Sequence, residues 1–218
     1  MNFIKTSFLS GLSTAISFIA RGISFKIIAT FLGTSGMFLI GQLRDFLRLG
    51  NAFSTFGIEN GIVKYTSEYD KSEKEFIKII STSFKINVFS ALIICLIAIL
   101  LELPFDLISK FLGLNETINK SLFVLILLIS IFSFSIHTCL LAIINGLKKI
   151  KFWVAINIIS NLTAASLLVL LVYLFDNKIN GALYAIIISQ IVTLIINVTL
   201  IYFLKPFKIS QLFSAFSY

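Results

Sequence analysis

The sequence predicts an all-α integral membrane protein, and two observations support that fold class. Hydrophobic residues make up 58% of the 218-residue chain and charged residues only 13%, whereas about a quarter of a soluble domain is charged. The apolar residues also form runs long enough for a helix to cross the hydrocarbon core. These runs neither alternate nor match barrel strands in length, so the segments must be helices, which satisfy their own backbone hydrogen bonds in lipid.

Six windows qualify as spanning helices. They are residues 8–32, 36–60, 83–103, 120–146, 152–175 and 181–204. The first window follows a single lysine, Lys5, contains Arg21 and is not closed by a small-residue cleavage pattern, so we interpret it as a membrane helix and not a removed signal peptide. We expect residues 1–204 to form a six-helix lobe and residues 205–218 to form a cytoplasmic linker.

The lysines between the windows predict the orientation of the helices. Alternate flanks hold ten of them: Lys5, Lys64, Lys71, Lys74, Lys78, Lys148, Lys149, Lys151, Lys205 and Lys208. The other connectors, residues 33–36, 104–119 and 176–180, hold only Lys110 and Lys178. The positive-inside rule then places both termini in the cytoplasm. The segment 64–82 could form an interfacial helix or extend the third span, but we expect a solvated linker.

The second window carries charges where lipid contact would be expected. An ionisable group at the bilayer centre costs about 2.5–3.5 kcal/mol on insertion scales. On a helix, Arg44 and Arg48 lie about 40° apart and Glu59 about 20° further on, while Asp45 borders this stripe and can partly neutralise one arginine. The opposite, lipid-facing side is expected to hold Leu39, Phe46, Leu49, Phe53 and Phe56.

The first window adds two more cations, Arg21 and Lys26, which lie about 140° apart on a helix and need not share a face. The two acidic residues of the second window can offset only two of the four cations. Structural ion pairs are one interpretation, but the surplus positive charge favours a pathway or a water-filled cavity. Such a cavity suits an anionic substrate such as a phosphate, which arginine binds through its bidentate fork.

No catalytic constellation accompanies these charges. The chain has one histidine, His137, and the sequence shows neither a metal-ligand cluster nor a nucleotide-binding loop. We therefore expect no enzyme activity, cofactor or metal, and the net charge of +8 does not indicate nucleic acid because the lysines lie in membrane connectors. His137 fits a helix-packing hydrogen bond and a proton relay about equally, and Cys95 and Cys139 are expected to be packed thiols.

Four stretches in order resemble the bacterial polysaccharide flippases, which translocate lipid-linked oligosaccharides of the O-antigen type and share a superfamily with multidrug and toxin extrusion transporters. They are FKIIATFLGTSG (25–36), RDFLRLGNAFSTFGIENGIVKYTSEY (44–69), CLLAIINGLKKIKFWVAINIISN (139–161) and NGALYAIIISQIV (180–192). The resemblance implies an inner-membrane transporter of lipopolysaccharide biosynthesis that works by alternating access. Its cationic cavity would receive the pyrophosphate of an undecaprenyl carrier.

The resemblance also assigns roles to residues. Lys26 and Arg44 match family positions and Arg21 and Arg48 fit by helix face, so these four are expected to bind the pyrophosphate. Asp45, Glu59 and His137 are expected to tune those charges or carry coupling protons.

Family members usually have two six-helix lobes, twelve helices or more, whereas this chain has one. The expected partners are therefore a second lobe or partner chain, the lipid-linked oligosaccharide, membrane lipid and the polysaccharide polymerase machinery. One alternative is a cation-coupled small-molecule exporter of the same superfamily, which the four cations against two acids disfavour. The other is an inactive, truncated membrane protein. The sequence specifies neither the sugar unit nor the coupling ion.

Overall fold

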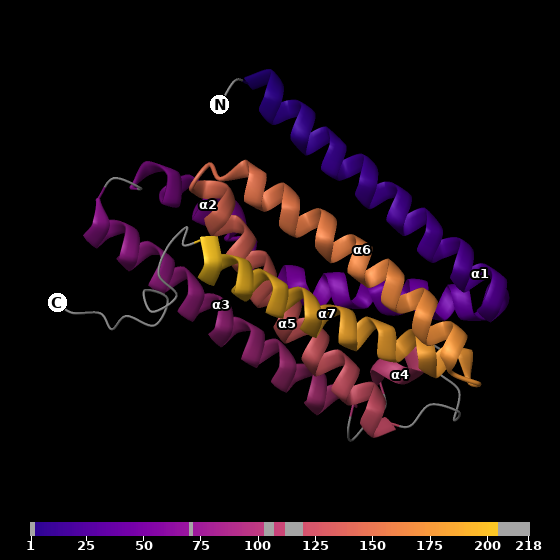
Figure 1. Ribbon diagram of the computed structural model, residues 1–218. Helices are drawn as coiled ribbons and strands as arrows, with labels where there is room; N and C mark the ends of the chain where they lie inside the picture. The colour runs from indigo at the N-terminus through magenta and orange to yellow at the C-terminus, as the bar shows by residue number, and fades with distance from the viewer. Residues whose placement is uncertain (1–2, 70–71, 103–106, 112–119, 205–218) are drawn as a thin grey trace.

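The computed structural model of the chain describes residues 3–69, 72–102, 107–111 and 120–204, and within these ranges all of its regular secondary structure is helical (Figure 1). The elements are α1 (Phe3–Thr55), α2 (Glu59–Glu68), α3 (Glu73–Glu102), α4 (Leu107–Phe111), α5 (Lys120–Gly146), α6 (Ile150–Leu174) and α7 (Lys178–Leu204). Five of these helices are long and apolar enough to cross a membrane. The predicted class, an all-α membrane protein, is therefore confirmed.

The first helix, α1, consists of two arms that fold back on each other at Gly33. This glycine has φ 68° and ψ −169°, a conformation that side chains with a Cβ rarely adopt. The fold-back is measurable, because the Arg44 guanidinium lies 5.8 Å from the centre of the Phe25 ring, although 19 residues of straight helix would span about 28 Å. Residues 3–32 and 34–55 thus correspond to the first two predicted spans, and α3, α5, α6 and α7 to the other four.

The end of the second span differs from the prediction. The arm ends at Thr55 and not at residue 60, because Phe56 and Gly57 both have positive φ, 47° and 66°. Glu59 therefore begins a new helix, α2, whose first turn it occupies. The helical phase that would place Glu59 on the stripe of Arg48 is lost at this turn.

The segment 64–82 is not the solvated linker that we expected. It includes the second half of α2 and the first ten residues of α3, which begins at Glu73 and not at residue 83. Both helices are amphipathic at this end of the bundle, since Ile62, Thr66, Phe76 and Ile80 are buried. The described charged residues of this segment, Lys64, Glu68, Glu73, Lys74, Glu75 and Lys78, are exposed on the opposite faces. The expected linker 205–218 lies outside the described residues.

The helices form a bundle in which α5 is central. It packs against α3, α7, α2 and the second arm of α1, while α6 packs against α7 and α1. Large side chains on the outside are exposed and suited to lipid contact, among them Phe18, Phe89 and Tyr173. On the predicted lipid face of the second arm, Leu49 and Phe53 are exposed, but Leu39 and Phe46 pack partly against the core and Phe56 lies in the turn.

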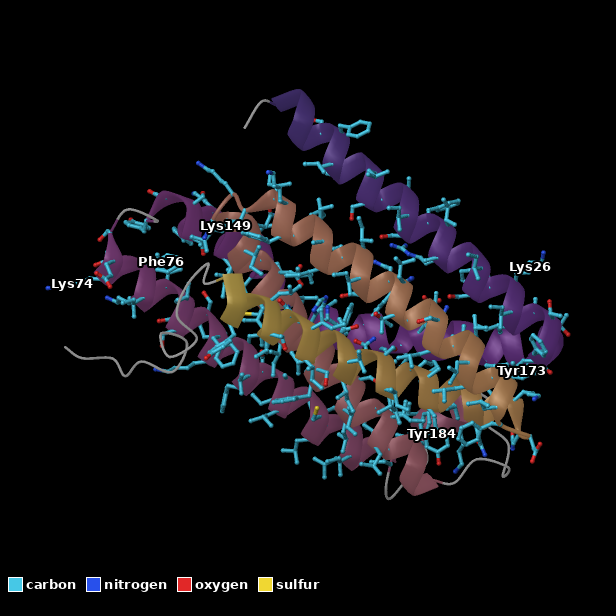
Figure 2. All side chains as sticks on the ribbon, in the orientation of Figure 1. Lys26, Lys74, Phe76, Lys149, Tyr173 and Tyr184 are labelled. Carbon is cyan, nitrogen blue, oxygen red and sulfur yellow. The ribbon has the colours of Figure 1, made fainter. Side chains whose placement is uncertain are left out.

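The lysine-rich junctions meet at one end of the bundle. Figure 2 shows Lys74 and Lys149 at that end, and Lys26, Tyr173 and Tyr184 toward the other, where the α1 turn and the α6–α7 junction lie. The helices therefore alternate in direction as the lysine pattern requires.

Candidate functional site

A cavity of about 240 Å³ lies between the two arms of α1 and helices α5, α6 and α7. Its charged lining residues are Arg21, Arg44 and Arg48, and its uncharged polar ones are Ser24, Ser130, Asn161, Ser189 and Gln190. The remaining lining side chains are apolar: Ala20, Leu47, Phe134, Ala164, Ala165, Leu168, Ala185 and Ile186. The structure thus brings together three of the four cations that the sequence singled out.

Two of these arginines lie near the middle of the bundle's length. Arg21 precedes Gly33 by 12 residues and Arg44 follows it by 11, which corresponds to about 18 Å and 16 Å of helix from the turn. A hydrocarbon core is about 30 Å thick. The fold-back at Gly33 is therefore what places the two guanidinium groups at nearly the same depth.

The arginines are only partly neutralised. Arg48 Nη1 lies 3.1 Å from Asp45 Oδ1, and both side chains are exposed, by 67% and 72%. Arg44 stacks on the ring of Phe25, an attraction between a cation and the face of a π system. Neither Arg21 nor Arg44 has an ion pair among the described residues, so the cavity keeps a surplus of positive charge.

The other predicted site residues lie away from the cavity. Lys26 is exposed and lies toward the turn end of the bundle (Figure 2), and Glu59 belongs to α2. His137 is buried between α5 and α7, where its Nδ1 lies 3.1 Å from the Asn197 amide nitrogen. This geometry matches the helix-packing interpretation of His137, while its role in proton transfer stays a prediction.

One single hydrogen bond and one cluster of hydrogen bonds hold helices together around the cavity. Asn161, on the lining, donates from Nδ2 to Ser17 Oγ at 3.0 Å and so joins α6 to the first arm of α1. Near the end of the second arm, a chain of hydrogen bonds joins α1, α5 and α3. The Ser54 hydroxyl donates to Ser135 Oγ, and the Ser135 hydroxyl donates to Asn87 Oδ1, each at 3.0 Å. The Ser90 hydroxyl donates to the Ser54 carbonyl in the same cluster. All four residues are buried, and the cluster fixes the second arm against its neighbours.

Ser130 is a cavity residue whose importance sequence reasoning missed. Its side chain is 1% exposed, and its hydroxyl has no hydrogen-bond partner in the described part of the chain. The sequence shows only a serine on the polar side of an apolar helix, which is usually a packing residue. Its burial and its place on the lining of the same cavity as the arginines depend on how α1, α6 and α7 pack around α5.

The described residues contain no group of three or more histidine, cysteine or carboxylate side chains that could hold a metal ion. Cys95 and Cys139 are free and buried in α3 and α5, which confirms that they are packed thiols.

Fold and cavity together define a multi-helix membrane protein with a cationic site between its helices. A family model described as polysaccharide biosynthesis protein matches residues 3–217. The chain belongs to this family, which includes flippases and other transporters, and the resemblance seen in the sequence is thereby confirmed. No curated protein and no solved structure matches the chain.

Proposed function

We propose that the chain forms part of an inner-membrane flippase that moves a polyprenyl-diphosphate-linked oligosaccharide from the cytoplasmic to the outer leaflet. One observation carries this proposal: Arg21, Arg44 and Arg48 converge on one cavity inside a membrane protein of polysaccharide biosynthesis. Intramembrane cations are costly and usually mark a substrate pathway.

A diphosphate matches the chemistry of this cavity. Three guanidinium groups line the cavity, and one of them, that of Arg48, is paired with a carboxylate, Asp45, which leaves an excess of two positive charges. Each guanidinium offers donors in a planar fork that suits phosphate oxygens. The diphosphate oxygens can therefore replace water as hydrogen-bond acceptors for the arginines. The positive charge of the arginines then compensates the negative charge of the diphosphate within the membrane.

The proposed mechanism is alternating access around this cavity. The Arg48 side chain is 67% exposed, so one side of the cavity is open. Sites of such transporters commonly lie at the interface of two repeats, and we propose that a second lobe or a partner chain covers the open side. Movement of the two halves would then expose the diphosphate to each side of the membrane in turn.

The orientation with both termini in the cytoplasm rests on the lysine distribution. Lys85 in α3 adds one lysine to the ten of the cytoplasmic set, and Lys120 at the start of α5 adds one to the two of the other set. Lys26 lies toward the turn end of the bundle (Figure 2) and adds another lysine to that second set, and the bias of eleven to four still points the same way under the positive-inside rule.

Among the proposed coupling residues, Asp45 is the one beside the arginines. Its carboxylate pairs with Arg48, so a change in its protonation would alter the charge that the substrate meets. Glu59 on α2 and His137 between α5 and α7 would have to act through other side chains, and their coupling role stays a prediction.

The proposal is tested by removing two of the charges. The change is Arg44→Ala with Arg48→Ala in the complete protein, made in a strain whose surface polysaccharide depends on it. We expect loss of surface polysaccharide, because the diphosphate is no longer compensated in the membrane, and accumulation of the lipid-linked unit at unchanged protein level. Polysaccharide is measured by gel electrophoresis and protein by immunoblotting.

Lys26→Ala is the matched control, since it removes a cation from the same hairpin outside the cavity. It should leave the polysaccharide near the wild-type amount. Full polysaccharide in the double arginine variant would overturn the proposed diphosphate site.

A further inference from the structure

The turn between α5 and α6 carries a cluster of lysines at the level of the membrane surface. The candidate spans Phe123–Gly146 and Ile150–Leu174 lie on either side of this turn, so the turn falls in the layer of lipid headgroups. Lys148, Lys149 and Lys151 lie within four residues of one another, and Figure 2 shows Lys149 at this junction. We call these three residues the lysine turn.

The lysine turn is accessible, and its charge is not neutralised by the described part of the chain. Lys148 and Lys151 are exposed and Lys149 is partly exposed. None of the three has an ion pair within the described ranges. The helix α2, which packs against the end of α5, carries Glu59 and Glu68, and neither carboxylate pairs with the lysine turn. Three positive charges therefore lie together without a carboxylate partner among the described residues.

The backbone of Lys148 has a conformation that favours glycine. Its φ is 56°, and its N–H donates to the Asn145 carbonyl at 2.9 Å. The N–H of Lys149 donates to the Ile144 carbonyl at 3.3 Å. These two bonds form the common helix ending in which the left-handed residue is usually glycine. A side chain at that position is strained, so the backbone alone does not explain a lysine there.

Two aromatic side chains lie next to the lysine turn on its membrane side. Phe152 and Trp153 follow Lys149 by three and four residues, so they lie one turn further along the same side of α6. Both rings pack partly against buried core residues. Aromatic rings at this depth are typical of the membrane interface, where their apolar part contacts acyl chains. The site thus combines a cationic edge with an apolar side.

We propose that the lysine turn binds the headgroup of an anionic phospholipid, whose acyl chains lie beside Phe152 and Trp153. The lipid supplies the negative charge that the described residues do not, and its chains match the apolar side of the site. A zwitterionic lipid is disfavoured because its headgroup brings a cation of its own. Basic sites between spanning helices suit anionic headgroups for the same reason. This inference does not depend on the proposed function.

The size of the preference follows from the number of lysines that one headgroup meets. Each lysine near a membrane surface strengthens the attraction to anionic lipid by about five-fold. A single headgroup that contacts one or two lysines should therefore bind roughly 5- to 25-fold more tightly than a zwitterionic one at low salt. Because the lysines are at least partly exposed, this preference should shrink as salt is added.

The test uses Trp153, the only tryptophan of the chain, as a built-in probe. The complete chain is reconstituted in phosphatidylcholine vesicles, and part of the lipid is replaced by brominated phosphatidylglycerol or brominated phosphatidylcholine. Bromine quenches tryptophan fluorescence at short range. We expect phosphatidylglycerol to quench Trp153 at lower mole fractions, with a relative binding constant of about five or more. The combined change of Lys148, Lys149 and Lys151 to glutamine should bring this constant close to one.

The combined change of Lys26, Lys74 and Lys178 to glutamine is the matched control. It removes the same charge from other parts of the bundle (Figure 2 shows Lys26 and Lys74 away from Lys149) and should leave the preference unchanged. The single change Lys148→Gly separates binding from stability. Glycine adopts the left-handed conformation freely, so this variant should unfold no more easily than the wild type, yet its preference for phosphatidylglycerol should fall.

Three results would each overturn the lipid site. The first is equal quenching of the wild-type chain by both brominated lipids. The second is an unchanged preference in Lys148→Gly and in the triple variant of the lysine turn. The third is an equal loss of preference in the control variant, which would mean that only the total charge of the chain attracts anionic lipid. Circular dichroism establishes that each variant keeps its fold.

Discussion

The cavity and the joint between α2 and α5 are opposite kinds of structure, and the stretch of residues 44–69 contributes to both. Residues 44–55 bring Arg44 and Arg48 to a cavity that is open on one side. Residues 56–69 form a turn and α2, which packs closely against the end of α5. A Cβ at Gly146 would lie only 2.7 Å from Thr66 Cβ and 2.9 Å from the Val63 carbonyl oxygen.

The comparison shows that the turn at Phe56 and Gly57 separates two segments with different physical requirements. On one side of Phe56 and Gly57, the chain must keep space and charge available for a ligand. On the other side, it must bring two helices closer than side chains allow, so a glycine is required. The stretches 44–69 and 139–161 that carry the family resemblance meet at this joint. Substitutions in residues 44–55 should therefore change mainly ligand binding, whereas substitutions in the joint of α2 with α5 should change mainly stability.

The largest effect on stability is expected for Gly146→Ala. The added methyl group would overlap the α2 backbone, and overpacking of this kind costs about 1–3 kcal/mol. We expect a lower unfolding midpoint in detergent, measured by circular dichroism, with pyrophosphate affinity unchanged in the fraction that remains folded.

Gly61→Ala in α2 is the control for that variant, because nothing lies within 4 Å of a Cβ at this position. Alanine is a better helix former than glycine by about 1 kcal/mol, so this variant should be as stable as the wild type or more so. An unaltered midpoint for Gly146→Ala would contradict the close joint.

A smaller loss of stability is expected for Gly57→Ala. Its φ of 66° is left-handed, and an L side chain there costs about 1–2 kcal/mol. Because the turn separates the two regions, we expect a lower unfolding midpoint by the same measurement and at most a small change in pyrophosphate affinity. A change confined to affinity would mean that the turn positions the arginines and does not merely end the helix.

The smallest effect is expected for Asp45→Asn. Removing this carboxylate releases Arg48 and adds one net positive charge to the cavity, but both side chains are exposed and screened. We expect pyrophosphate to bind about two- to five-fold more tightly at low salt, with the difference shrinking as salt is added. Titration calorimetry at two ionic strengths measures it, and weaker binding would show that Asp45 orients Arg48 for the ligand.

The sequence predicts the helices well because long apolar runs have few other structures available in lipid. Helical phase also relates Arg44 to Arg48 correctly, since one uninterrupted arm carries both. Helical phase predicts the wrong position for Glu59, because the positive φ angles of Phe56 and Gly57 end the helix between Arg48 and Glu59. Helical phase alone also cannot predict whether Arg21 or Lys26 lines the cavity, because this depends on which face of the first arm packs against α6.

The left-handed joint at Gly33 has a consequence for how the chain enters the membrane. Helical structure extends from residue 3 to residue 55 with only this glycine out of helical conformation, so no non-helical loop separates the arms. We therefore expect the two arms to enter the membrane as one helical hairpin. Arg21 would then enter the lipid together with Arg44, Asp45 and Arg48. These side chains would give Arg21 polar neighbours before α6 and α7 have been synthesised.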